Sequence, residues 1–438
     1  MKFSKLALPT IFLASLVSNI SLGAIPIKGE ILRFEKECST GNKVNIAATG
    51  DILMHLVLQV QAHRYGGYKH MWQELKPYFK QMDIVYGNLE TPIAPGHFLK
   101  SGIPNDRSFY KNRDYQHLLK KGYSNFPRFN AGPELLEALS EDFNILSTAN
   151  NHTFDRGEAG SDATIDNLEE YGFGFKNSGK VEDGDYTGTT KKKSKRKVWH
   201  AEITRNNIRI AFLSCTYHTN GINNSNRDQV LRCLERGSKQ VANQKLVKLV
   251  QKLSNEYDAL IVTPHWGSEY TPRINRQRQA LSEQLFENGA LAVLGAHPHV
   301  IQKWEKFPRL TDLHGKTKDR FVIYSLGNFF ANQGKGSSGK RDVIQRTGMV
   351  LNLGLIKTDD NDVHIQGVNY LPYYMTTGKT AILSNKRRSI IPLNSKKLSK
   401  YPKLKRHIKN ADAYVNEVLP REQRIESLEE LRNIDFCR

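Results

Sequence analysis

Short apolar runs alternate with amphipathic stretches from residue 43 to about residue 357. The apolar runs are rich in β-branched residues and are bounded by polar turns, which is typical of buried strands. They cover residues 44–49, 83–86, 143–146, 208–213, 259–262, 291–294 and 321–324. Apolar positions at helical spacing occupy residues 133–139, 164–171, 240–253 and 276–288. This alternation predicts a layered α/β architecture. Residues 348–356 and 363–370 are expected to be paired strands that close the edge of the sheet.

Polar side chains that can bind a metal ion follow most of the predicted strands. The candidates are Asp51, Glu90, Asn151, His265, His297 and His299. Parallel strands bring their carboxyl ends to one edge of a sheet, so residues far apart in the chain can meet there. Carboxylates, amide oxygens and imidazoles are ligands for Mn, Fe or Zn. About six ligands with one bridging carboxylate would hold two ions.

Each of these residues also has a structural explanation. Asp51 follows a glycine and suits a turn or a helix cap. Glu90 could be a surface carboxylate, and His265 could be a hydrogen-bonded core imidazole. The sequence His297-Pro298-His299 is harder to explain in this way, because both imidazoles can point into one cleft from a strand end. Taken as an ordered set on successive strand ends, the residues predict a shared metal site.

Composition fits a folded, basic protein. The 438 residues are 39% hydrophobic and 25% charged, and the formal net charge is +20. Such an excess favours polyanionic partners, namely an acidic polymer, an anionic membrane surface or nucleic acid. Six of the seven residues at 191–197 are basic, and residues 386–409 hold ten Lys or Arg and no acidic residue. Both runs are expected to be solvated, and docking onto an anionic surface is the alternative.

The N-terminus narrows these options. Lys2 and Lys5 precede an apolar run over residues 6–17, and small residues follow at Ser21, Gly23 and Ala24. This pattern predicts a signal peptide over residues 1–24, with an uncleaved anchor as the alternative. Export to the periplasm or cell envelope would make nucleic acid a poor partner. The same compartment would permit disulfides, and one between Cys38 and Cys437 would tie the chain ends together, whereas Cys215 also suits a buried apolar position.

Several motifs occur together in a fixed order. They are Gly50-Asp51, Asn88-Leu89-Glu90, Ala149-Asn150-Asn151-His152, Asp155 with Gly157, His265-Trp266-Gly267, His297-Pro298-His299-Val300 with Gln302, and Ser325-Leu326-Gly327-Asn328-Phe329. The set resembles the poly-gamma-glutamate capsule synthesis (CapA-like) family, which is similar in turn to calcineurin-like metallophosphoesterases. The resemblance covers about residues 44–330 and implies a four-layer α/β sandwich over residues 44–375, followed by a basic, partly helical extension over residues 376–438.

The resemblance also implies a role for each candidate residue. Asp51 and His299 would bind a first metal, and Glu90 would bridge to a second metal. Asn151, His265 and His297 would bind that second metal. His152 would face the substrate as general acid, held by Asp155. Two features depart from the phosphoesterase pattern: Leu53 stands where a metal-binding His is common, with His55 out of phase, and Glu90 replaces a bridging aspartate.

Two functions follow from this interpretation. The first is a metal-dependent hydrolase in an envelope polymer pathway, which acts on a phosphoester or on an amide of a polyanionic chain. The alternative is a binding or export factor that holds an acidic polymer such as poly-gamma-glutamate without turnover, which the absence of a His at Leu53 favours. No glycine-rich loop ending in lysine is present, so nucleotide binding by a P-loop is not expected.

Overall fold

The computed structural model describes most of the chain. The described residues are 26–98, 113–173, 177–178, 199–222, 229–238, 240–334, 340–377, 387–394, 404–432, 434 and 436–437. The predicted signal peptide, the basic run at 191–197 and part of the basic run at 386–409 (residues 386 and 395–403) lie outside these residues.

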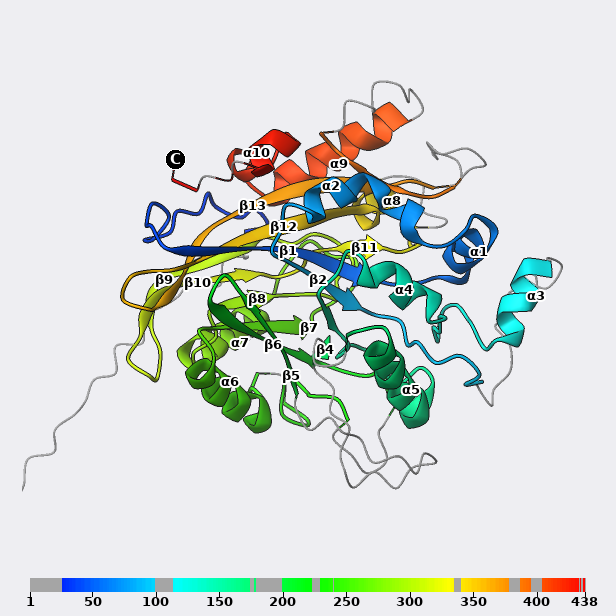
Figure 1. Cartoon of the computed structure of the whole chain (residues 1–438), viewed down its shortest axis with the longest axis horizontal. Helices are drawn as coiled ribbons and strands as arrows, with labels where there is room; N and C mark the ends of the chain where they lie inside the picture. Colours follow the sequence, from blue (N-terminus) through cyan, green and yellow to red (C-terminus); the bar gives the residue numbers. More distant parts are fainter. Residues whose placement is uncertain are drawn as a thin grey trace, which may run out of the picture.

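The strands form two sheets, which are the inner layers of the fold (Figure 1). The first sheet follows the order β14 (Ile390–Pro392), β13 (Val363–Met375), β12 (Thr347–Lys357), β1 (Asn42–Ile52), β2 (Ile84–Leu89), β3 (Ile145–Ser147) and β4 (Asn177–Ser178), and β11 (Asn328–Phe330) pairs with β1. Strands β1 to β4 are parallel, whereas β12, β13 and β14 are antiparallel additions. The candidate residues Asp51 and Glu90 therefore stand at the same end of adjacent strands.

The second sheet is also parallel at its centre. Its order is β5 (His200–Arg205), β6 (Ile208–Thr216), β7 (Ala259–His265), β8 (Ala292–Leu294), β10 (Thr317–Ile323) and β9 (Trp304–Thr311). Strands β6, β7, β8 and β10 run parallel, and the hairpin partners β5 and β9 lie at the two edges. His265 ends β7, and His297 and His299 follow β8.

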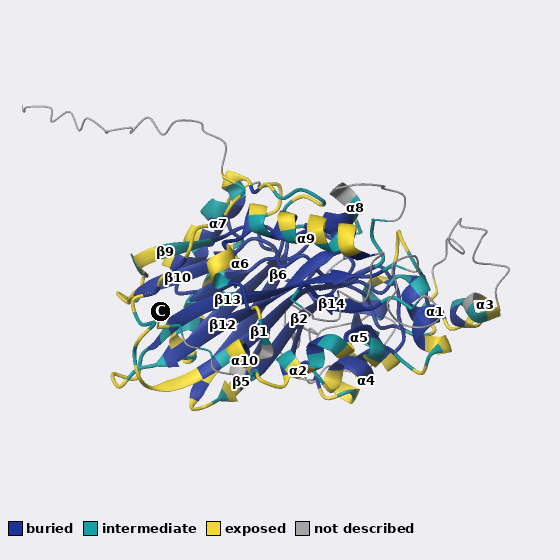
Figure 2. Ribbon diagram, turned by 90° about the horizontal axis from the view of Figure 1, so that it is seen from above, coloured by how far each residue is buried: buried dark blue, intermediate teal, exposed yellow. Residues whose placement is uncertain are grey.

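The two sheets pack face to face because alternate side chains of a strand point to opposite faces. In β1, Val44, Ile46 and Ala48 enter the core between the sheets, while Ala47 joins the core under the outer helices. The central strands of both sheets are dark and buried when coloured by exposure, and the exposed surface lies on helices, loops and the edge strands β5 and β9 (Figure 2).

Helices cover the outer face of each sheet. The helices are α1 (Leu56–Arg64), α2 (Lys76–Phe79), α3 (Arg113–Lys120), α4 (Glu134–Ser140), α5 (Gly157–Glu170), α6 (Gln244–Glu256), α7 (Arg276–Glu287), α8 (Lys340–Gln345), α9 (Lys405–Val418) and α10 (Leu428–Arg432). Helices α1, α2, α4 and α10 share a core with the first sheet, and α6 and α7 share one with the second. The prediction of a four-layer α/β fold is confirmed, and helix α5 begins at Gly157, seven residues before the predicted start at 164.

The C-terminal segment packs onto the rest of the chain. Helix α9 buries Ala411, Tyr414 and Val415 in the core between the sheets. The predicted pairing of residues 348–356 with 363–370 is confirmed by β12 and β13, but the edge strand is β14, which pairs outside β13 and buries Ile390 and Ile391. The division of the chain at residue 375 stays a prediction.

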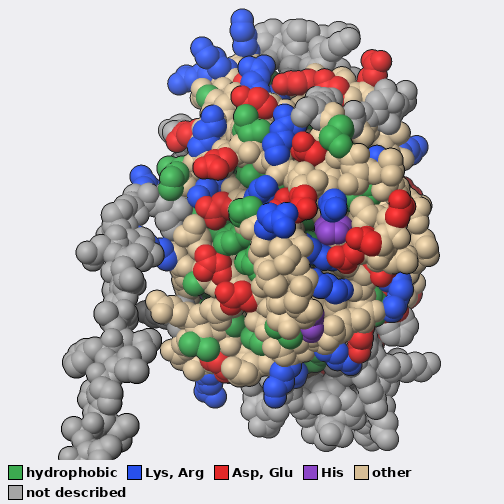
Figure 3. All heavy atoms as spheres, turned by 90° about the vertical axis from the view of Figure 1, so that its left-hand side faces the viewer, with side chains coloured by type: hydrophobic (Ala, Val, Ile, Leu, Met, Phe, Trp, Pro, Cys, Tyr) green, Lys and Arg blue, Asp and Glu red, His purple; other side chains and the backbone are tan. Residues whose placement is uncertain are grey.

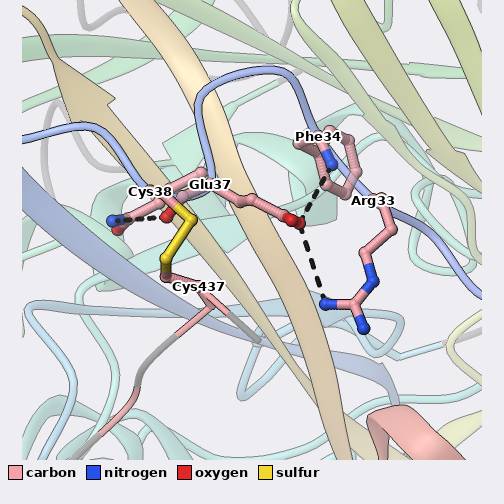
Figure 4. Close-up of a disulfide and its surroundings, with 6 residues drawn as sticks. Arg33, Phe34, Glu37, Cys38 and Cys437 are labelled. Carbon is pink, nitrogen blue, oxygen red and sulfur yellow. Dashed lines mark hydrogen bonds and ion pairs between the residues drawn. A yellow bond between two sulfur atoms is a disulfide. The ribbon is translucent and has the colours of Figure 1, made fainter.

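A disulfide between Cys38 and Cys437 confirms the predicted tie between the chain ends (Figure 4). Close to it, the ring of Phe436 lies over Gly354 and Gly367, where an added Cβ would approach the ring to 2.3 Å and 2.2 Å. Two glycines thus leave room for the ring, and the C-terminus is held by packing as well as by the covalent bond.

The surface is mixed in charge. Figure 3, seen from the left-hand side of Figure 1, shows basic and acidic side chains interspersed on that face. Within the described ranges, no helix is both long enough and apolar enough to cross a bilayer.

Candidate metal centre

Asp51 is placed by a close backbone approach at the end of β1. The Asp51 amide donates to the carbonyl of Gly327 (3.0 Å), and a Cβ on Gly50 would lie only 1.7 Å from that oxygen. Glycine is therefore required before the aspartate, which accounts for the Gly50-Asp51 motif. The Asp51 carboxylate is fully buried and accepts hydrogen bonds from the side-chain amide of Asn88 (2.7 Å) and the backbone N–H of His297 (3.2 Å).

The loop after β3 carries Asn151 to the same place. Its shape is fixed by Asn150, whose side-chain amide donates to the carbonyl of Leu89 (2.8 Å) and whose side-chain oxygen accepts the N–H of His152 (3.1 Å). Asn150 thus has a positioning role, and Asn151 and His152 are turned toward Glu90, which follows β2.

The two histidines after β8 have unusual backbone conformations. The φ angle is 95° at His297 and 56° at His299, in the left-handed region that L-residues with a side chain seldom adopt. Strain of this kind is concentrated at functional sites. The turn directs both buried imidazoles back toward the first sheet.

One group of donors surrounds Glu90, His265 and His297, whose ligand atoms all lie within 4.8 Å of one another. The Nε2 atom of His265 lies 2.9 Å from Oδ1 of Asn151 and 3.3 Å from Oε1 of Glu90. The Nδ1 atom of His297 lies 3.1 Å from the same His265 nitrogen. Four side chains from two sheets therefore converge on one small volume.

A second group shares the same glutamate. Asp51, Glu90 and His299 also place ligand atoms within 4.8 Å of one another. The Nδ1 atom of His299 lies 3.1 Å from Oδ2 of Asp51 and 3.8 Å from Oε2 of Glu90. Glu90 thus offers one oxygen to each group, as a bridging carboxylate would. The structure brings all six predicted ligands together, and their role in binding metal stays a prediction.

The electrostatics of the cluster suit cations. Burial lowers the pKa of His265 to about 3 and the pKa of His297 well below its usual value, so both imidazoles stay neutral and keep a free lone pair. Burial, and then the charge of Asp51, raise the pKa of Glu90 well above its ordinary value. Burial also opposes the ionisation of Asp51, but the hydrogen bond and charge of His299 outweigh it and lower the Asp51 pKa.

Glu90 provides the test of whether a metal fits. Both of its carboxylate oxygens are buried without a hydrogen-bond partner among the described residues. A buried carboxylate of this kind is costly unless it is paired or binds a metal. Hard oxygen donors mixed with neutral imidazoles are the donor set of Mn, Fe or Zn, so the residues present fit divalent ions.

His152 and Asp155 form a pair beside the ligands. The Nδ1 atom of His152 lies 2.7 Å from Oδ2 of Asp155, which also accepts the backbone N–H of Phe129 (2.6 Å). The Nε2 atom of His152 is 4.0 Å from Oε1 of Glu90. Asp155 thus orients the ring so that its far nitrogen faces the centre, as expected for a proton donor.

Several residues at the centre were not among the predicted ligands. The Oδ1 atom of Asn328 lies 3.0 Å from Nδ1 of His299, and its place in the last sequence motif was a signal for it. The ring of His218, just beyond β6, stands edge-on to that of His297 with centroids 5.2 Å apart. No motif marked His218, although it too follows a parallel strand.

The structure also shows where Leu53 and His55 lie relative to the two donor groups. Leu53 is buried in the apolar core under the outer helices. His55 stands apart from the two donor groups, and its Nδ1 accepts the backbone N–H of Asn332 (3.1 Å). Neither residue supplies a ligand in these groups.

Comparisons with known proteins identify a matching family and similar sequences. The model of the family described as "Bacterial capsule synthesis protein PGA_cap" matches residues 45–333. The capsule biosynthesis protein CapA of Bacillus anthracis is 27% identical over 299 residues, which cover 67% of this chain and 61% of the relative. The PGA biosynthesis protein CapA of Bacillus subtilis (strain 168) is 24% identical over 291 residues, which cover 65% and 62%. The chain thus spans about six tenths of the length of these relatives.

A solved structure of 5'-nucleotidase from Candida albicans SC5314 is also similar. It is 11% identical, with a TM-score of 0.36, and the match covers 90% of this chain and 60% of that one.

Proposed function

The chain belongs to the bacterial capsule synthesis protein family PGA_cap, and on that premise we propose that it is an exported metal-dependent hydrolase of the phosphoesterase type. It would act in the synthesis or export of an acidic envelope polymer. The names of its relatives, which refer to capsule and PGA biosynthesis, support the pathway. Two disulfides support an oxidising, extracytoplasmic location, because such bonds persist outside the reducing cytosol.

The observation that carries the proposal is the position of Glu90. Its buried carboxylate belongs to both donor groups, one with His265 and His297 and the other with Asp51 and His299. Two divalent ions, each on one side of Glu90, would satisfy both of its oxygens. Bound ions would supply Lewis-acid chemistry by polarising a phosphoryl or acyl oxygen and by making hydroxide available near neutral pH.

The remaining chemistry belongs to side chains of the chain itself. His152 would protonate the leaving group through Nε2, because its Nδ1 is engaged by Asp155. His218, half-buried next to His297, would contact the substrate at the mouth of the site. The sheltered position of these groups would exclude bulk water and strengthen each charge interaction.

A second candidate function is binding without turnover. Leu53, buried among apolar side chains, supports it, because the centre has one imidazole fewer than a usual phosphoesterase site. In this case the metals and the excess of basic residues would hold an acidic polymer during export. An anionic membrane surface is a further partner of this kind, while nucleic acid is not expected for an exported protein.

One experiment separates these functions. The purified protein is supplied with Mn, and its metal content is measured beside that of an Asn151→Ala/His297→Ala double variant. Hydrolysis of a generic phosphodiester and of poly-gamma-glutamate is assayed in parallel, with His152→Ala as a third sample. A circular dichroism spectrum of each variant confirms that it is folded.

The hydrolase requires about two ions in the parent, fewer in the double variant, and turnover that is lost in His152→Ala while metal is retained. Bound metal without turnover of either substrate would favour the binding function. A parent that takes up no Mn would overturn the metal centre itself.

A further inference from the structure

A third acidic side chain approaches the centre from the exposed loop after β7. The carboxylate of Glu269 and the ring nitrogens of His297 and His299 lie within 4.8 Å of one another. Glu269 is exposed, whereas both histidines are at most 3% exposed. Its carboxylate therefore reaches the centre from the solvent side, while Glu90 reaches it from the interior.

The backbone around Glu269 is fixed to the histidine turn. The N–H of Tyr270 donates to the carbonyl of Pro298 (2.8 Å), between the two ligand histidines. The ring of Tyr270 stacks on that of His299, with centroids 5.8 Å apart and an interplanar angle of 29°. Tyr270 has a φ of 61°, a left-handed backbone conformation that residues with a bulky side chain seldom adopt. These contacts hold the loop so that Glu269 stays beside the two histidines.

Further contacts hold the loop on both sides of Glu269. Gly267 has a φ of 90°, and a Cβ at this position would lie 2.7 Å from Nη1 of Arg278. Gln302 accepts a hydrogen bond from Arg278 (2.5 Å) and donates through its side-chain amide to the carbonyl of Thr271 (2.7 Å). Both ends of the loop are therefore anchored to buried side chains, with Glu269 between them.

The charge at the centre gives the carboxylate its role. The Glu269 carboxylate faces two buried imidazoles, those of His297 and His299. Three carboxylates beside neutral imidazoles repel one another, and a cation among them turns that repulsion into attraction.

We propose that Glu269 is a metal ligand, and that it forms with His297 and His299 a donor group on the solvent side of the centre. The inference rests on the metal centre of the proposed function. Glu269 would thus add an oxygen donor to a centre that has Leu53 where a metal-binding His is common. Because it is the exposed member of this donor group, it is also the ligand that an oxyanion of the substrate would displace.

The test is a titration of the metal-free protein with Mn, followed by the bound-ion count and by the rise in melting temperature. Three variants are compared with the parent. Glu269→Gln keeps the size and removes the charge, and Glu269→Asp keeps the charge on a shorter arm. Glu256→Gln changes an exposed glutamate at the end of α6, just before β7 and therefore at the opposite end of that strand from His265. Glu269 is exposed, so its variants are expected to fold, and a circular dichroism spectrum verifies this.

The parent is expected to bind two ions, and Glu269→Gln to lose about tenfold or more in affinity for one of them. Glu269→Asp should recover part of that loss, and Glu256→Gln should match the parent. Equal affinity for both ions in the parent and in Glu269→Gln would overturn this inference and leave the proposed function intact. Failure of the parent itself to bind Mn would overturn both.

Discussion

The Nε2 atom of His265 lies 2.9 Å from Oδ1 of Asn151, although the two residues are 114 positions apart in the chain. His265 ends a strand of the second sheet, and Asn151 follows a strand of the first. This contact shows that the candidate centre lies where the carboxyl edges of two sheets meet.

Replacement of Glu90 by Gln should have opposite effects on metal binding and on stability. The variant should lose most of its Mn, because both donor groups share this carboxylate. In the presence of a chelator it should be more stable than the parent by about 1–3 kcal/mol, because the change removes an acid whose ionisation is opposed by burial and by Asp51, and whose oxygens have no hydrogen-bond partner among the described residues. Metal analysis and urea denaturation test this. Unchanged metal content with reduced stability would identify Glu90 as a structural residue.

Replacement of Asp155 by Asn should reduce turnover and spare the metals. The carboxylate holds Nδ1 of His152 at 2.7 Å, and an amide would leave the ring in the wrong orientation or tautomer. We expect kcat to fall by roughly 10²-fold or more, with a shifted pH profile and the parent's metal content. If metal is lost together with activity, Asp155 instead supports the fold of the loop.

His55 should make the metal-free protein sensitive to acid. Burial lowers its pKa from 6.5 to about 3, and its Nδ1 accepts the N–H of Asn332 only when it is unprotonated. As pH falls below 6.5, the unfolded chain takes up a proton that the folded chain refuses, so stability falls. Between pH 6.5 and pH 5, His55 alone should contribute a loss of roughly 1–2 kcal/mol.

The control for this prediction is His55→Asn, which keeps an acceptor near the position of Nδ1. The difference in unfolding free energy between parent and variant, measured with a chelator at several pH values, isolates His55 from the other buried histidines. A parallel pH dependence in the two proteins would contradict the prediction.

Removal of the Cys38–Cys437 disulfide should destabilise the protein and release its C-terminus. The bond joins residues 399 positions apart and restricts the unfolded chain. Cys38→Ser/Cys437→Ser should lower the free energy of unfolding by roughly 2–4 kcal/mol. Limited proteolysis should then cut near Phe436, whereas Cys215→Ser/Cys233→Ser should leave that end protected. Equal protection in both variants would mean that the packing of Phe436 is sufficient.

The sequence alone determined which segments are strands or helices and which types of side chain are candidate metal ligands. Strands such as 259–262 and helices such as 276–288 carry their signal locally, in the spacing of apolar residues, and both were found at the predicted places. Asp51, His297 and His299 were also identified by position, because each follows an apolar strand. These features depend on residues close together in the chain, which is why a pattern can predict them.

Only the tertiary structure decided how the strands divide between two sheets and which donors meet. Asp51 accepts the N–H of His297, which is 246 residues away, and no local pattern encodes that contact. The same holds for Asn328 beside His299 and for the bond between Cys215 and Cys233. The proximity of Glu269 to the histidine turn, likewise, depends on the hydrogen bond from Tyr270 to Pro298. Such pairs arise from the packing of whole layers, whose geometry is fixed by the many buried contacts of the core together.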